Sequence, residues 1–133
     1  MDLKPIVKFK IHPWCYPKFY FSVKIFKTNK ILNTYIKDMV EKYPSLYYIN
    51  CWGMCVKYGG KYYCKKNLCG EILLSSDRLF VDTISHECVH AAHHLCKLNG
   101  ITKEKEEWIA TATGDLTEAV YKGIGNNYEV LGI

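Results

Sequence analysis

The feature of the sequence that most constrains the fold is a change in the spacing of its apolar residues near position 76. Before it, short runs rich in aromatic and β-branched residues predict strands. After it, apolar residues recur with the period of a helix. This helical pattern is interrupted at Asn99-Gly100, a pair typical of a helix C-terminus. We therefore expect two helices joined by a tight turn, the first capped by Asp77 or Asp82 and ending near Leu98, the second running from Thr102 to about Lys122.

The first 75 residues predict strands around a single helix. The expected strands are 6–11, 18–26, 46–58, 61–65 and 70–75, and the expected helix is 29–43, which Pro44 ends. The predicted order β-β-α-β-β-β-α-α defines an α+β fold. With 133 residues, of which 49% are apolar, residues 1–133 are expected to form one domain.

The composition limits the expected partners. The formal net charge is +5, but the lysines are scattered along the chain rather than clustered, so nucleic acid is not an expected partner. No targeting signal and no apolar run of about 20 residues is recognisable, so a membrane is not expected either. We expect a cytoplasmic protein, in the host cytosol if the chain is viral, with its thiols reduced.

Within the first C-terminal helix lies His86-Glu87-Cys88-Val89-His90, an HExxH motif. Residues four apart lie one turn apart on the same helical face, so both imidazoles can bind one cation. Glu87 is placed to reach a water on the metal and to act as general base when that water attacks a carbonyl. The motif predicts a zinc site with hydrolytic chemistry, because zinc lowers the pKa of its bound water towards about 7.

A third zinc ligand is expected on the second C-terminal helix, since a glutamate there completes a His₂Glu site. The candidates are Glu104, Glu106, Glu107 and Glu118. Glu107 shares a helical face with Ala110 and Gly114, and small residues let two helices approach closely. We expect Glu107 to be the ligand, with the other three as alternatives. Tyr121 lies on the same face, where it packs in the core or stabilises an oxyanion.

Three segments together resemble a known family. They are Thr83-Ile-Ser-His-Glu-Cys-Val-His-Ala-Ala, Glu106-Glu107-Trp-Ile-Ala and Gly114-Asp-Leu-Thr-Glu. Over residues 70–122 the chain is similar to small gluzincin-type zinc metallopeptidases, closest to the compact ones that bacteriophages encode.

The resemblance implies a zincin-like fold, in which a small mixed sheet packs with an edge strand against the HExxH helix and a C-terminal helix follows. It implies zinc bound by His86, His90 and Glu107, with Glu87 as general base. It also implies that residues 70–75 form the edge strand, which aligns an extended peptide or protein substrate by backbone pairing.

Four cysteines flank Gly59-Gly60, which predicts a type I′ turn between two strands. They are Cys51, Cys55, Cys64 and Cys69. Pairing across this turn would set Cys55 opposite Cys64, with Cys51 near Cys69. The four thiols could hold a second metal, form disulfides or remain free.

Two functions remain open from the sequence. The first is a zinc-dependent peptidase in which Glu87 activates the attacking water. The second is a non-catalytic binding protein on a zincin scaffold, in which the zinc is structural or vestigial and the protein contacts a host or viral partner. Retention of Glu87 favours the peptidase, because a structural site needs no base.

Overall fold

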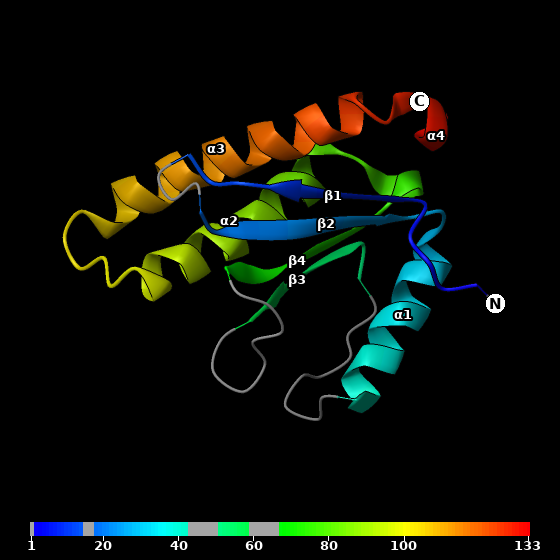
Figure 1. Cartoon of the computed structure of the whole chain (residues 1–133), viewed down its shortest axis with the longest axis horizontal. Coiled ribbons are helices and arrows are strands. Elements are labelled where there is room, and N and C mark those ends of the chain that lie inside the picture. The colour runs from blue at the N-terminus through cyan, green and yellow to red at the C-terminus, as the bar shows by residue number, and fades with distance from the viewer. Residues whose placement is uncertain (1, 15–17, 43–50, 59–66) are drawn as a thin grey trace.

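In the computed structural model, residues 2–14, 18–42, 51–58 and 67–133 are described. The strands are β1 (Val7–Ile11), β2 (Tyr20–Phe26), β3 (Gly53–Lys57) and β4 (Leu68–Ser75). The helices are α1 (Asn29–Lys42), the short 3₁₀ turn η2 (Ser76–Arg78), α2 (Val81–Leu98), α3 (Lys105–Gly125) and α4 (Tyr128–Leu131). A sheet with helices on both of its faces agrees with the predicted α+β class (Figure 1).

The four strands form one mixed sheet in the order β1-β2-β4-β3. β1 pairs with β2 and β3 pairs with β4 in antiparallel fashion, whereas β2 and β4 are parallel. β4 is therefore an interior strand, and all eight of its residues are buried. The prediction that residues 70–75 form the edge strand is wrong, because β3 covers that side of β4, and in the described part of the chain β3 is the strand at the edge.

α2 and α3 cover one face of the sheet and enclose the larger core. Side chains such as Val23, Ile72, Ile84, Leu95 and Leu116 are fully buried in it. α1 covers part of the opposite face, where Phe26, Leu32, Ile36, Val56 and Leu73 form a smaller core.

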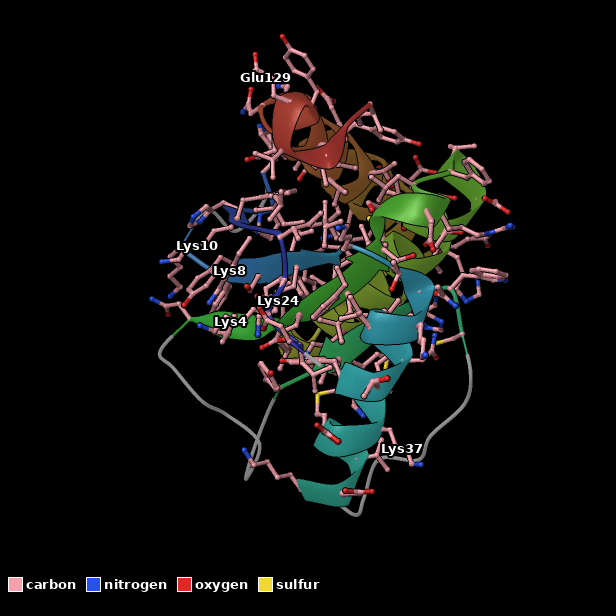
Figure 2. The ribbon with its side chains drawn as sticks, turned by 90° about the vertical axis from the view of Figure 1, so that its right-hand side faces the viewer. Lys4, Lys8, Lys10, Lys24, Lys37 and Glu129 are labelled. Carbon is pink, nitrogen blue, oxygen red and sulfur yellow. The ribbon has the colours of Figure 1, made fainter. Side chains whose placement is uncertain are left out.

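The part of that second face that α1 leaves uncovered is polar. Lys8 pairs in register with Lys24, and Lys10 with Ser22, so these side chains share one face. Figure 2 shows Lys8, Lys10 and Lys24 on β1 and β2, beside α1. Lys24 lies 3.0 Å from Glu71 of β4, and both side chains are largely buried.

The helix starts differ from the predicted caps. α2 begins after Phe80, and α3 begins after Glu104, which has a positive φ of 53°. Asp77 instead accepts a hydrogen bond from the backbone N–H of Asn29 at 3.0 Å, so this carboxylate satisfies the first turn of α1. A tertiary contact therefore replaces the local cap that the sequence pattern predicted. Among the described residues, no helix is both long and apolar enough to cross a bilayer.

Candidate metal centre

The HExxH motif lies in the middle of α2, as predicted. One face of this helix is apolar and packs into the large core, through residues that include Ile84, Cys88, Ala92 and Leu95. His86 and His90 lie on the other face, and both are exposed. The core therefore holds the helix in place while the two imidazoles remain accessible to solvent.

The two imidazoles are already close enough to share an ion. The Nε2 atoms of His86 and His90 lie 3.3 Å apart, with ring centroids 4.9 Å apart and an interplanar angle of 77°. Two nitrogens bound tetrahedrally at 2.0–2.1 Å from one zinc ion are about 3.3 Å apart. The separation of the two nitrogens thus fits a tetrahedral ion.

Glu87 lies beside this pair but is buried, with 6% of its surface exposed. Ligand atoms of His86, Glu87 and His90 all lie within 4.8 Å of one another. Burial raises the pKa of Glu87 above its usual value, while the charge of His86 and a hydrogen bond from the backbone of Cys55 act in the opposite direction. The carboxyl group is thus oriented by the edge strand and partly removed from water.

Gly53 permits the close packing of α2 on β3. A Cβ at this position would lie 3.1 Å from Cγ2 of Thr83 and 3.3 Å from Cγ of Glu87. A larger residue here would push the helix away from the edge strand. The absence of a side chain at position 53 therefore helps to set the distance between the strand and the candidate site.

The surroundings of His90 favour its neutral form. Desolvation lowers its pKa, and the positive charges of His86, Lys57 and His93 lower it further. A neutral imidazole is the form that binds metal ions. His94, one turn after His90, has a different contact. Its Nε2 donates to the carbonyl oxygen of Tyr58 at 2.9 Å, and this hydrogen bond joins α2 to the end of β3.

Glu107 is not brought to the two imidazoles. Among the described residues, the cluster of potential metal ligands contains His86, Glu87 and His90 and no residue of α3. Glu107 is exposed and lines a separate hollow beside Trp14 and Trp108. The structure thus provides no third protein ligand at the position that the sequence predicted.

The rotation of α3 explains this difference. Its buried residues are Ala112, Leu116, Val120 and Ile124. Glu107 is nine residues from Leu116, which at about 100° per residue places it on the opposite side of the helix. Gly114 makes no close approach either, since a Cβ there would meet nothing within 4 Å. The small residues that suggested a helix interface face away from the core.

The remaining α3 candidates also lie outside the cluster. Glu118 is exposed and pairs with Lys122 at 3.5 Å, and Glu104 lines the same hollow as Glu107. Glu106 is exposed, and Tyr121 is 40% exposed on the face that carries Glu107. None of these side chains belongs to the cluster around the two imidazoles.

Among the described cysteines, Cys51 does not lie opposite Cys69 as predicted, and the predicted pairing of Cys55 with Cys64 involves a residue outside the described ones. Cys55 lies opposite Ile72 of β4, and Tyr58 donates its N–H to the carbonyl oxygen of Cys69. Cys51 is held instead by α1, where the side chain of Asn33 bonds both its N–H and its carbonyl oxygen. Cys51, Cys55 and Cys69 are free thiols, and Cys64 lies outside the described residues.

Sequence reasoning missed the contribution of β3 to the site. The backbone N–H of Cys55, the missing side chain of Gly53 and the charge of Lys57 all act on the motif from a strand about 30 residues earlier. No local pattern in the sequence signals these contacts, because they depend on the strand order.

Comparison with protein-family models, curated proteins and solved structures found no match. The function must therefore be argued from the geometry of the site.

Proposed function

We propose that this protein is a metal-dependent hydrolase of the metallopeptidase type, with a zincin-like arrangement of its site. The observation that carries the proposal is the Nε2 separation of 3.3 Å between His86 and His90, with the carboxyl group of Glu87 beside the pair. His86 and His90 would hold the ion. Zinc is the best candidate, because two imidazoles suit it and it would supply a Lewis acid that lowers the pKa of water and polarises a carbonyl.

Glu87 is suited to the role of general base. Burial raises the pKa of Glu87 above its usual value, which makes the carboxylate a stronger base, and a nearby cation would act in the opposite direction. The hydrogen bond from the backbone of Cys55 favours the ionised carboxylate, which is the form that a base requires. The carboxyl group is thereby held ready to accept a proton beside the two imidazoles.

An extended peptide is the substrate class that the neighbouring strand supports. Among the described strands, β3 lies at the edge of the sheet, and it packs along α2. Tyr58 points its N–H towards β4, so alternation along the strand turns the backbone groups of Lys57, Cys55 and Gly53 away from β4. The N–H of Cys55 already faces Glu87, which leaves the other outward groups for a substrate. An extended substrate would pair with β3, in place of the predicted pairing with residues 70–75.

The alternative is a non-catalytic protein that keeps the scaffold. It is favoured by one observation: apart from Glu87, which the proposal uses as the base, the described residues bring no further protein ligand to His86 and His90. Under this alternative the metal site would contribute nothing to hydrolysis, and Glu87 could be replaced without functional loss.

The test is elemental analysis of zinc in purified protein, followed by hydrolysis of a fluorogenic casein substrate. We expect about one zinc per chain in the wild type, loss of most of it in His86→Ala and His90→Ala, and retention in His93→Ala, a matched exposed histidine on the same helix. Because His86 and His90 are exposed, their removal should change the free energy of unfolding of the metal-free protein by no more than about 0.5 kcal/mol.

Two further variants separate the alternatives. Glu87→Gln should lower the hydrolysis rate by about 10² to 10⁴-fold. Glu107→Gln should keep its zinc, since this side chain lies outside the cluster. Unchanged zinc content in both His→Ala variants would refute the proposed metal centre, and zinc binding without any Glu87-dependent hydrolysis would leave the non-catalytic alternative in place.

A further inference from the structure

A second hollow lies away from the HExxH motif, between α3 and the connection from β1 to β2. Its volume is about 260 Å³, and we call it the tryptophan hollow. The residues that decide its chemistry are Trp14, Trp108, Lys103, Glu104, Glu107 and Asp115. In Figure 1 the chain after β1 runs beside the N-terminal half of α3.

The hollow is assembled by a contact between distant parts of the chain. The backbone N–H of Trp14 donates to the carboxylate of Asp115, 101 residues away in the sequence. Trp108 is half-buried and packs against the large core, so it forms a fixed wall. Trp14 is 79% exposed, although most tryptophan side chains in folded proteins are largely buried. The fold thus holds a large aromatic surface in solvent at the rim of a cavity.

The charges around the hollow oppose the charge of the whole protein. Glu104, Glu107 and Asp115 contribute three carboxylates against the single ammonium group of Lys103. The chain as a whole has a net charge of +5. A cation that enters the hollow would meet carboxylates together with the electron-rich faces of indole rings, which attract cations.

The shape and chemistry favour a guanidinium group over other cations. A guanidinium is planar, so it stacks on an indole while its N–H groups donate to carboxylates, whereas an ammonium is a strongly hydrated point charge. The volume lies below the range of about 300–1,000 Å³ that is typical of pockets for drug-sized ligands, and so suits a single side chain.

We propose that the tryptophan hollow binds an arginine side chain of a partner protein, with the guanidinium between the indoles of Trp14 and Trp108 and the carboxylate of Glu107 as its main ionic partner. This role does not depend on the metal centre. It gives the glutamate that the sequence assigned to zinc a different function, that of an anchor for a basic segment.

The test is a titration followed by tryptophan fluorescence, in the variant Trp52→Phe, which removes the indole that lies outside the hollow. The probe is the peptide acetyl-Gly-Gly-Arg-Gly-Gly-amide, and its matched control replaces arginine by citrulline, which has nearly the same shape but no charge. We expect the arginine peptide to change the emission with saturation, and the citrulline peptide to bind at least about tenfold more weakly.

Three substitutions locate the binding. Glu107→Gln and Trp14→Ala should each weaken the binding of the arginine peptide about tenfold. Glu118→Gln, which changes an exposed glutamate on the same helix, should leave the binding unchanged. Trp14 and Glu107 are exposed, so circular dichroism should show that these variants remain folded. Equal binding of the citrulline peptide, or full binding by Glu107→Gln, would overturn the assignment. Retention of binding in His90→Ala would show that it is independent of the metal centre.

Discussion

The two faces of the sheet are covered unequally, and the two candidate sites lie on the better covered side. The core under α2 and α3 contains side chains from all of β1, β2 and β4 as well as both helices. The core under α1 is smaller, and beside it lies an open hollow lined by Lys4, Tyr35, Tyr58 and Glu71 among others. The histidines of the candidate metal centre lie on α2, and α3 forms one wall of the tryptophan hollow. Both helices have a continuous apolar face.

This contrast shows how the fold supports exposed chemistry. An exposed imidazole on a helix keeps a defined position when the opposite side of that helix is packed. α2 meets this condition through Ile84, Cys88 and Leu95, which are fully buried. The α1 face instead relies on polar contacts: Lys24 donates to both Tyr35 and Glu71, and Tyr58 donates to Glu71 at 2.7 Å.

The largest expected difference between the faces is in the stability that is lost when a core side chain is shortened and leaves a cavity. Leu95→Ala, in the large core, should lower the free energy of unfolding by about 4 kcal/mol. Ile36→Ala, under α1, should cost about 2 kcal/mol, because the neighbouring open hollow lets the site relax or hydrate. Urea denaturation of both variants measures the difference, and equal losses would show that the two cores are equally well packed.

A smaller effect is expected from the ion pair on the α1 face. Lys24→Met should destabilise the fold by about 2–3 kcal/mol, because it leaves the largely buried Glu71 without its cation. The double variant Lys24→Met/Glu71→Gln removes both charges and should recover part of this loss. If the single and double variants were equally stable, the pair would act through packing rather than through charge.

The smallest expected effect is a pH dependence that comes from the same lysine. Burial lowers the pKa of Lys24, but the hydrogen bond and charge of Glu71, helped by Tyr35, outweigh this, so its pKa is raised above 10.5. A pKa that is higher in the folded state contributes stability that is present below pH 10.5 and is lost as the pH rises through the folded-state value. The wild type should therefore lose more stability than Lys24→Met as the pH rises above 10.5, as followed by urea midpoints. Parallel losses in both proteins would contradict this assignment to Lys24.

Most helices and strands were accessible from local patterns. The helical period predicted α1, α2 and α3, and the β-prone runs predicted β1, β2 and β4, with errors of a few residues at the ends. β3 occupies only residues 53–57 of the expected strand 46–58, and the expected strand 61–65 lies outside the described residues. These elements depend on neighbours within a few positions, which is the information that a sequence pattern contains.

The sequence by itself determined the core of the candidate metal centre, because the geometry of an α-helix places His86 and His90 one turn apart wherever the helix lies. The tertiary structure alone decided which strand lies at the edge, which residue lies opposite Cys55 and where Glu107 points. Each of these depends on a relation between separate elements: the order of β3 and β4 in the sheet, the register of Cys55 with Ile72, and the rotation of α3 that buries Leu116. Contacts between residues far apart in the chain determine such relations, and the spacing of residues within one segment does not record them.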